Sequence, residues 1–476
     1  MTGAGQPSRP SLFRDRAAGE HARVTFLELF FDLIFVFAVT QLSDELRAHF
    51  SAQGVLETAM LMLAVWWVWI FTAWVTNWLE PNRTPVRLMM LALMFVGLAF
   101  SSALPEAFGH RGWIFAVAYA SMQIGRTLFM LRAIPPENVS LTRNFQRVLV
   151  WLTASAVFWL VGGAFSETAR LALWGIALAI EYVGPAVLFW VPTMGRSNVD
   201  DWNVEGGHLA ERAGLFIIIA LGESILVIGH TFAEARWTAA RLLAFAFEFI
   251  SSVAMWWLYF DRSADLGAAQ IRLAANPGRL ARLAYTYLHL PMVAGIVLFA
   301  TGNEMALATP GDPSDVKTTV AVVGGAMVYL IGVSLFKHAV RGWYQLSHLA
   351  GVALLGGLWF LALKLPALGL TGLGLSGAGA RRGVGGAPPA PRREPIDPRL
   401  IDAATSHRRR APRPAVRRDT PSPRWPSCSG RPGGSDRPDP AASSRSGPTA
   451  GRWPRSAGRR RCAAREPRRA HPEARP

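Results

Sequence analysis

The chain has 476 residues, of which 51% are hydrophobic and 17% are charged, a low share of charge for a soluble protein of this size. Its net charge of +17 is concentrated at the C-terminal end, because residues 365–476 hold 24 Arg, no Lys and eight acidic residues. Both cysteines, Cys428 and Cys462, also lie there, so neither a disulfide nor a thiolate metal site is expected in the nearly neutral body.

Residues 1–22 are polar and basic, and we expect them to form a cytoplasmic N-terminal segment. The apolar run from Val24 to Leu42 is about 19 residues long, which is enough to cross a bilayer as a helix. Because this run carries acidic residues and lacks a small-x-small cleavage site, we expect it to stay in the mature protein as the first span.

Apolar segments of bilayer length recur through residues 23–365 and predict an all-α, polytopic transmembrane helical bundle. The expected spans cover residues 24–42, 55–78, 88–108, 113–131, 147–165, 171–191, 213–231, 242–260, 283–308, 318–336 and 343–363. The loops between these eleven spans are short, so we expect one compact bundle rather than separate domains.

The basic residues of the loops predict the orientation. With the N-terminus inside, 17 Arg and Lys residues fall on the cytoplasmic side and six on the opposite side. Cytoplasmic loops of membrane proteins carry the excess of such residues. We therefore expect a multi-pass protein with a cytoplasmic N-terminus and the lipid bilayer as its partner.

Residues 366–476 consist mainly of Arg, Pro, Ala, Gly and Ser, a composition typical of disorder. Eleven spans would leave this tail outside, whereas a twelfth would return it to the cytoplasm, and Leu365–Leu375 looks like the start of one. One hypothesis is that a reading-frame slip has replaced the original end. The alternative is a natural basic tail that binds anionic lipid or nucleic acid, although we expect no nucleic-acid partner for the body.

The order of features suggests two six-helix units with the last span lost. An acidic span with Glu28 and Asp32, followed by the Trp-rich span Trp66–Trp78, opens the first half. An acidic span with Glu223, followed by a span with two adjacent tryptophans, opens the second.

Glu28 and Asp32 lie four residues apart in the first span and so share one helical face. A carboxylate near the centre of a bilayer costs roughly 2.5–3.5 kcal/mol, so this face should look into the bundle or a wet cavity. Two interpretations are open: a proton or ion pathway, or a structural pair neutralised by an interior arginine such as Arg126.

The seventh span carries several polar groups. His208 and Glu211 share a face at the expected cytoplasmic mouth, Glu223 lies mid-membrane, and His230 follows seven residues later beneath the same face. A carboxylate and an imidazole on one face can pass a proton or coordinate a cation. The alternatives are an interhelical hydrogen bond made by Glu223 and an interfacial position for His230.

Other spans hold isolated polar residues. Glu181 precedes Pro185 by four residues, which predicts a polar group beside a kink, with pathway and structural roles both open. Glu248 and His289 pose the same choice.

Two long motifs resemble the bacterial low-temperature-requirement A family. They are ELFFDLIFVFAVTQL at Glu28–Leu42 and HLAERAGLFIIIALGESIL at His208–Leu226, and Trp-Val-Thr-Asn-Trp at Trp74–Trp78 fits as well. The resemblance covers roughly residues 20–365 and implies a polytopic protein of the bacterial inner membrane without naming a reaction. The tail departs from the family pattern, which normally closes with more apolar helix.

A looser likeness links Phe31–Thr40 to the first-span motif of the two-times-six-span potassium channels of lysosomes and bacteria. Phe31 stands where those channels have a serine before the aspartate. The likeness implies that Asp32 serves pore architecture rather than proton exchange.

The leading hypothesis is a secondary transporter or ion-conducting protein whose polar core uses Glu28, Asp32 and Glu223. The alternatives are a membrane-embedded enzyme acting on a lipid or isoprenoid, with Glu223 and His230 as acid and base, and a non-catalytic membrane sensor or scaffold. The sequence has no Walker A loop, paired CxxC or HExxH motif, so we expect no NTP-driven transport within this chain, no metal and no cofactor.

Overall fold

The computed structural model describes residues 11–14, 23–198, 202, 204–234, 236–261, 277–309, 311, 313–362, 365–366 and 369. The expectations for the tail, for a twelfth span and for most of the N-terminal segment concern residues outside these ranges.

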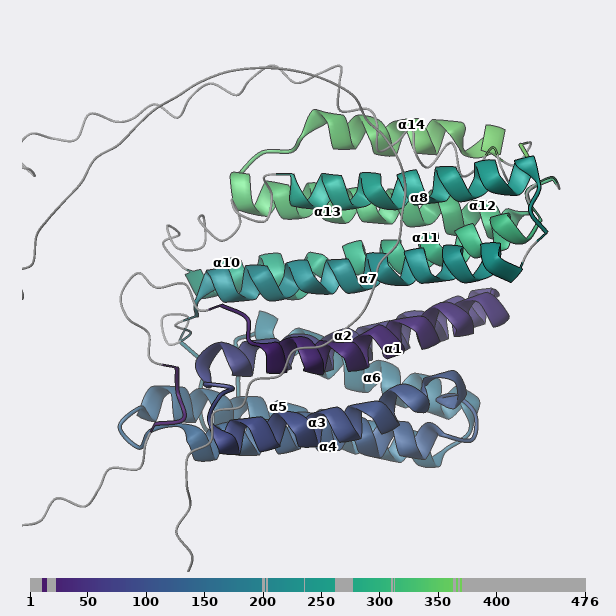
Figure 1. Cartoon of the computed structure of the whole chain (residues 1–476). Helices are drawn as coiled ribbons and strands as arrows, with labels where there is room; N and C mark the ends of the chain where they lie inside the picture. Colours follow the sequence, from purple (N-terminus) through teal and green to yellow (C-terminus); the bar gives the residue numbers. More distant parts are fainter. Residues whose placement is uncertain are drawn as a thin grey trace, which may run out of the picture. The chain divides into compact units, whose positions relative to one another are not determined.

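The described residues form an all-α bundle, as the sequence predicts (Figure 1). The helices are α1 (Phe26–Ala48), α2 (Ala52–Trp78), α3 (Thr84–Ser102), η1 (Leu104–Glu106), α4 (Gly112–Ala133), α5 (Val139–Ala164), α6 (Glu167–Ala186), α7 (Gly206–Glu234), α8 (Ala239–Phe260), α10 (Pro277–Ala281), η3 (Arg282–Tyr287), α11 (His289–Ala308), α12 (Val316–Thr319), η4 (Val320–Gly324), α13 (Gly325–Arg341) and α14 (Leu346–Ala362). Each expected span coincides with a long helix, and two of them combine α-helical pieces with the π-helical turns η3 and η4.

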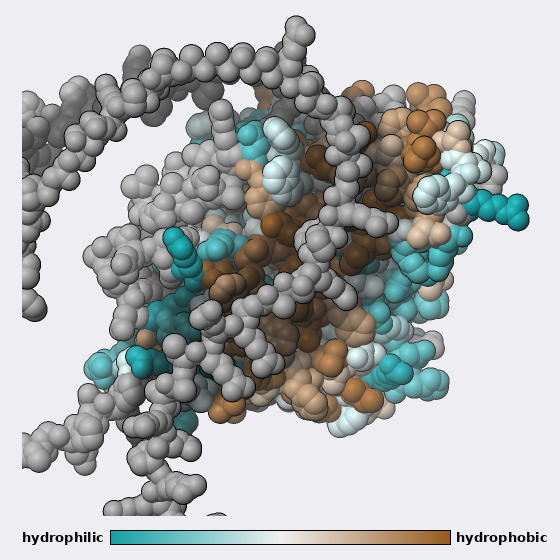
Figure 2. Space-filling view, in the orientation of Figure 1, coloured by the Kyte–Doolittle hydropathy of each residue, from teal (hydrophilic) through white to brown (hydrophobic). Residues whose placement is uncertain are grey.

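Nine helical stretches of the described chain are long and apolar enough to cross a membrane. The other two expected spans are α6 and α14, with 20 and 17 residues. Figure 2 shows apolar side chains gathered across the middle of one face, with hydrophilic side chains toward the ends of the helices. Large apolar residues such as Leu88, Phe95 and Leu226 are exposed on these helices. Such surfaces on helices of bilayer length identify a multi-pass membrane protein.

Short polar side chains begin several of the helices. Thr25 caps α1 through a capping box, in which its hydroxyl accepts from the backbone N–H of Glu28 and the Glu28 carboxylate accepts from the backbone N–H of Thr25. Ser51 and Asn138 cap α2 and α5 through a single hydrogen bond each, in which the side-chain oxygen accepts from a backbone N–H. The capping box thus fixes the direction of the Glu28 side chain at the start of α1.

The two halves of the bundle have the same order of neighbours. In the first half α1 packs on α2 and α3, α3 on α4, and α4 on α5. In the second half α7 packs on α8 and α11, α11 on α13, and α13 on α14. The halves meet where α1 packs on α7 and α11 (Figure 1). This correspondence is what two related units would produce.

Glycines bring α11 and α13 into backbone contact. A Cβ atom added at Gly325 would lie 2.5 Å from the backbone nitrogen of Phe299, and one added at Gly295 would lie 2.5 Å from that of Tyr329. Both distances are shorter than any real contact allows, so only glycine permits this approach. Small residues at helix interfaces serve this purpose in membranes, where packing rather than the hydrophobic effect holds helices together.

We expect Gly325→Ala to destabilise the bundle by about 1–3 kcal/mol, because its methyl group must push two backbones apart. Thermal unfolding of the detergent-purified protein measures this. Gly357→Ala in α14 is the matched control, since nothing lies within 4 Å of its added Cβ, and it should leave stability unchanged or raise it by up to about 1 kcal/mol. Equal melting temperatures for the two variants would contradict this account.

Candidate functional site

Two acidic residues of α1 face two basic residues of α7 with the same spacing. Glu28 Oε1 lies 2.8 Å from His208 Nε2, and Asp32 Oδ1 lies 2.7 Å from Arg212 Nη2. All four residues are buried. Because the members of each pair are four residues apart on their helix, the contacts form two successive rungs between parallel helices. We call these four residues the α1–α7 ladder.

The surroundings of His208 settle which ring nitrogen carries its proton. The Asn77 side chain is oriented by two bonds to the backbone of Glu205, so that its Nδ2 faces His208 Nδ1 at 3.2 Å. Since Nδ2 is a donor, His208 Nδ1 accepts, and the proton lies on Nε2. In that tautomer His208 Nε2 donates to Glu28 Oε1, while Arg14 Nη2 lies 3.3 Å from the same ring nitrogen.

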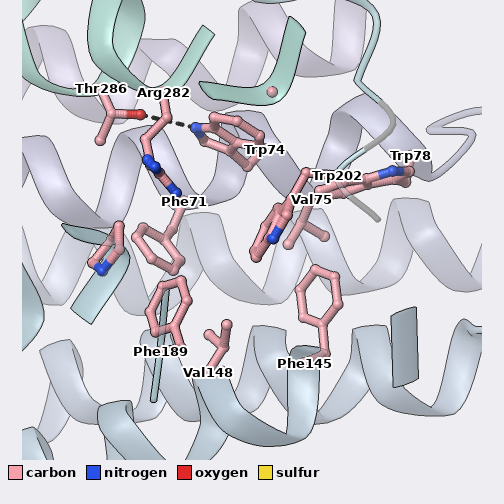
Figure 3. A pocket seen from close by; sticks show the side chains of 12 residues that line it. Phe71, Trp74, Val75, Trp78, Phe145, Val148, Phe189, Trp202, Arg282 and Thr286 are labelled. Carbon is pink, nitrogen blue, oxygen red and sulfur yellow. Dashed lines mark hydrogen bonds between the residues drawn. The ribbon is translucent and has the colours of Figure 1, made fainter. Parts of the chain in front are cut away.

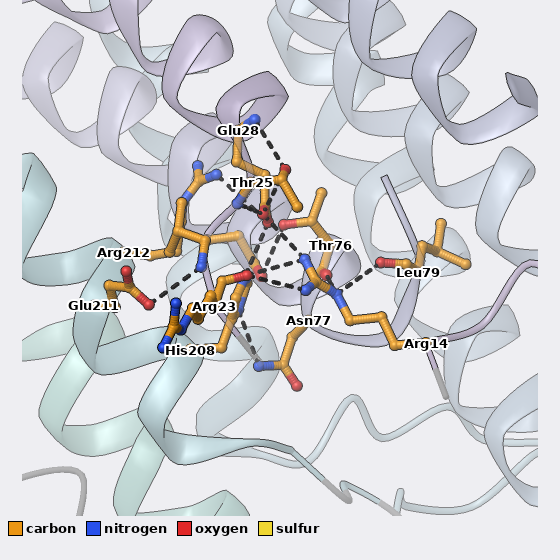
Figure 4. A network of polar contacts seen from close by, with 12 residues as sticks. Arg14, Arg23, Thr25, Glu28, Thr76, Asn77, Leu79, His208, Glu211 and Arg212 are labelled. Carbon is orange, nitrogen blue, oxygen red and sulfur yellow. Dashed lines mark hydrogen bonds and ion pairs between the residues drawn. The ribbon is translucent and has the colours of Figure 1, made fainter. Parts of the chain in front are cut away.

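Arg14 closes the ladder from the N-terminal side (Figure 4). Its Nη2 lies 3.0 Å from Glu28 Oε2, while its Nε donates to the backbone oxygens of Thr76 and Leu79. The backbone N–H of Arg14 also donates to Trp78, so the segment Ser11–Arg14 is fastened to the end of α2. Nothing in the pattern of residues 1–22 beyond their basic character predicts this role for Arg14.

Arg212 is the buried cation of the ladder, and it is incompletely satisfied. Its Nη2 bonds Asp32, its Nη1 lies 3.7 Å from Glu28 Oε1, and its guanidinium sits over the Trp69 ring at 5.7 Å. Trp69 Nε1 donates to Asp32 at 2.9 Å. Arg212 Nε and Nη1 and Asp32 Oδ2 have no hydrogen-bond partner among the described residues.

The neutralising arginine proposed from the sequence was the wrong one. Arg126 donates to Val68 and Thr72 of α2 and to Gln123, and it makes no ion pair with Glu28 or Asp32. The span expected over residues 213–231 begins just after Arg212, whereas α7 starts at Gly206 and includes it.

Glu181 is held entirely by neutral donors. It accepts hydrogen bonds from Tyr119 and from Ser155, the latter at 2.5 Å, and from Trp159 Nε1 at 3.1 Å. These partners come from α4 and α5, so Glu181 joins three helices of the first half. Pro185 lies one residue before the end of α6 rather than at a mid-helix kink.

A second polar region lies where α1, α7 and α11 end. Glu223 is buried and accepts from the Thr40 hydroxyl at 2.5 Å. Glu304 pairs with Arg47 at 3.1 Å, and Asp44 lies one turn after Thr40 on α1. We call Asp44, Glu223 and Glu304 the acidic cluster. From Arg212 to Glu223 is 11 residues of α7, or about 16 Å, so the ladder and this cluster are separate.

The structure places two further predicted residues, His230 and Glu211, at the surface. His230 is exposed, and its Nε2 lies 3.7 Å from Glu234 rather than beside Glu223. Glu211 is also exposed, and it accepts from the backbone N–H of Val24 at the start of α1.

An aromatic layer separates the ladder from the acidic cluster. The Phe35 and Phe216 rings, from α1 and α7, lie 6.3 Å apart, and Phe216 also packs on Trp66 and Trp69 of α2 at 5.4 and 4.4 Å. All four side chains are buried. The polar line along α1 and α7 is therefore interrupted by closely packed rings.

A pocket lies between α2, α5 and η3 (Figure 3). Its walls are largely aromatic, with Arg282 as the charged residue of the lining, and Trp74 Nε1 donates to Thr286 at 3.0 Å. The cavity volume is about 40 Å³, whereas sites for small-molecule ligands hold roughly 300–1,000 Å³. In this conformation the pocket does not accommodate a lipid or an isoprenoid.

The model of the family described as bacterial low temperature requirement A protein (LtrA) matches residues 23–378. The chain belongs to this family. An uncharacterized protein of Rhizobium meliloti is similar to this LtrA chain, with 41% identity over 337 residues that cover 71% of the chain and 82% of the relative. No solved structure matches the chain. Both ladder helices and the acidic cluster lie inside the LtrA match.

We expect Arg212→Met to lower the stability of this LtrA chain by about 3–5 kcal/mol, because it leaves the Asp32 carboxylate buried without a cation. Adding Asp32→Asn should recover most of this loss, since the amide oxygen still accepts from Trp69 while the charge is gone. Arg83→Met, at an exposed arginine, is the control and should change stability by no more than about 0.5 kcal/mol. Thermal unfolding compares the variants, and a double variant no more stable than Arg212→Met would refute the pairing.

Proposed function

We propose that this chain is a secondary transporter or ion-conducting protein for a cation, with its route along the interface of α1, α7 and α11. The observation that carries the proposal is the graded exposure of the acidic cluster. Asp44 is exposed, the Glu304 side chain is 20% exposed, and Glu223 is buried. Carboxylates that lead from a surface into a membrane bundle attract cations and are typical of ion and proton pathways.

The charge balance of the acidic cluster supports a cationic substrate. The acidic cluster holds three carboxylates, and among the described residues Glu304 forms an ion pair with Arg47. Thr40 contributes a neutral hydroxyl to Glu223. A group with surplus negative charge in a region of low dielectric gains stability when a cation or proton arrives.

In this proposal the aromatic layer and the ladder form the closed side of the route. The Phe35 and Phe216 rings pack against each other between the acidic cluster and Asp32. The ladder then stabilises the closed state, because its charges are paired with one another rather than with a substrate. This role assigns Glu28 and Asp32 to architecture, as the likeness to potassium channels implied for Asp32, and leaves Glu223 as the residue that meets the substrate.

We also propose that the ends of the helices at Thr25 and His208 face the cytoplasm and that the membrane is the bacterial inner membrane. The excess of basic loop residues on that side supports this orientation. The acidic cluster would then open to the outside.

The enzyme hypothesis has less support. Its acid and base would be Glu223 and His230, yet Glu223 bonds Thr40 whereas His230 is exposed beside Glu234. The aromatic pocket is also too small for a lipid substrate in this conformation. A sensor or scaffold role needs no substrate route and predicts no flux.

We expect Glu223→Gln to abolish cation uptake driven by a gradient in liposomes, because the amide keeps the size and the Thr40 contact but removes the charge. Glu234→Gln is the matched control, since it lies on the same helix with its side chain 73% exposed. Uptake is measured with Na⁺, K⁺ and H⁺ gradients after both variants are shown to insert and fold. Normal uptake by Glu223→Gln, or no uptake of any of these ions by the unaltered protein, would exclude the proposal.

We expect Phe216→Ala to raise the passive cation leak of the same liposomes, because it opens the aromatic layer between the two polar regions. Phe95→Ala, at an exposed apolar residue of α3, is the control. A leak that stays at the level of the control would show that the rings do not close the route.

A further inference from the structure

Three buried polar residues of α7, α8 and α11 have unpaired side-chain atoms, and none of them belongs to the ladder or the acidic cluster. They are Ser224, Glu248 and Asn303, each no more than 2% exposed. Ser224 Oγ, both carboxylate oxygens of Glu248, and both Oδ1 and Nδ2 of Asn303 have no hydrogen-bond partner within the described chain. Buried polar groups are almost always satisfied, so this concentration of unpaired atoms points to a bound group.

The register of the three helices brings these residues to one level. Ile228, Ala244 and Leu307 form a single contact cluster between α7, α8 and α11. Ser224 lies one turn before Ile228, Glu248 one turn after Ala244, and Asn303 one turn before Leu307. Because α8 runs antiparallel to α7 and α11, each of these three residues is displaced from the contact cluster in the same direction along the bundle. Residues four apart share a helical face, so the three polar side chains face the same interface.

No base on the packed helices neutralises Glu248 in the described structure. Two acids are adjacent in sequence to Ser224 and Asn303, namely Glu223 and Glu304. Glu223 accepts a hydrogen bond from Thr40 of α1, and Glu304 pairs with Arg47 of α1. Arg241, two turns away on α8, donates to the backbone oxygens of Arg236 and Ala308. Lys337 of α13 donates to Leu258 near the other end of α8. Glu248 is thus a buried carboxylate with no hydrogen-bond partner and no paired base among the described residues.

We propose that Ser224, Glu248 and Asn303 form a binding site for one dehydrated alkali-metal cation. The Glu248 carboxylate supplies the single negative charge that balances it, and Asn303 Oδ1 and Ser224 Oγ supply neutral oxygen ligands. Calcium and magnesium are poorer fits, because their sites use more oxygen ligands or retain several waters, usually with further carboxylates. The site goes beyond the proposed route: it lies on the α8 side of α7 and α11, whereas the acidic cluster lies on the α1 side.

The test is thermal unfolding of the detergent-purified full chain titrated with NaCl or KCl against choline chloride at constant ionic strength. The melting temperature should rise in NaCl or KCl by roughly 3 °C for each tenfold increase in cation above its dissociation constant. Separate Na⁺ and K⁺ titrations identify which ion is bound more tightly. A melting temperature that follows pH but neither cation would overturn the proposal, because Glu248 would then hold a proton.

Two variants locate the site. Glu248→Gln should lose the cation response and melt in choline chloride at or above the temperature of the unaltered protein, because it no longer buries an uncompensated charge. Ser224→Ala should keep the response but move its midpoint to higher cation concentration, which provides a second reading if Glu248→Gln fails to fold.

Glu234→Gln is the control and should keep the full cation response, whereas Glu223→Gln should keep the part of the response that Glu248→Gln removes. A response lost in Glu223→Gln but kept in Glu248→Gln would place the cation in the acidic cluster and overturn the proposal. Since this readout does not require transport, its result is independent of the liposome experiment.

Discussion

The structure depends on the neutralisation of charge inside a medium that does not solvate it. Glu28 and Asp32 sit in an apolar helix, and their burial is tolerable only because His208, Arg212 and Arg14 meet them at hydrogen-bonding distance. The ladder stabilises the bundle and also fixes the register of α1 against α7. Sliding one helix by one residue would separate both rungs at once. Apolar helices can pack in many registers, so a buried charge ladder is an effective way to select one.

That selection has consequences for the whole bundle, because α1 and α7 are where its two halves meet. Once their register is set, Phe35 lies against Phe216, and Thr40 lies against Glu223. The N-terminal segment is also linked to the ladder, since Arg14 binds both Glu28 and the end of α2. A change in the pairing of the ladder would therefore reach the aromatic layer and the acidic cluster through two rigid helices. This mechanical link makes the α1–α7 interface a suitable place for a gate.

Local patterns predict the helices and the inward face of Glu28 and Asp32, because both follow from hydropathy and from a period of four. The partner of Asp32 was missed for a related reason. Hydropathy favours starting a span after its charged residues, so the seventh span was drawn from residue 213 and Arg212 was excluded from it. The matching four-residue spacing of His208 and Arg212 was the signal that could have found it. Glu223 and His230 were also expected to act together because they share a helical face. Residues that share a face need not have the same depth or exposure, and these two have different partners.

The buried carboxylates differ most in what satisfies them, and this distinction cannot be read from one sequence. Glu28 and Asp32 pair with the cations Arg14 and Arg212, Glu181 has three neutral donors, Glu223 has one hydroxyl, and Glu248 has no hydrogen-bond partner among the described residues. A carboxylate with a complete set of internal partners has little to gain from a ligand, because binding would first have to break those bonds. A carboxylate without internal partners gains the most free energy from binding a ligand. The carboxylates that best fit cation binding are therefore Glu223 and Glu248, on the two faces of the α7–α11 pair, while those of the ladder hold the framework around them.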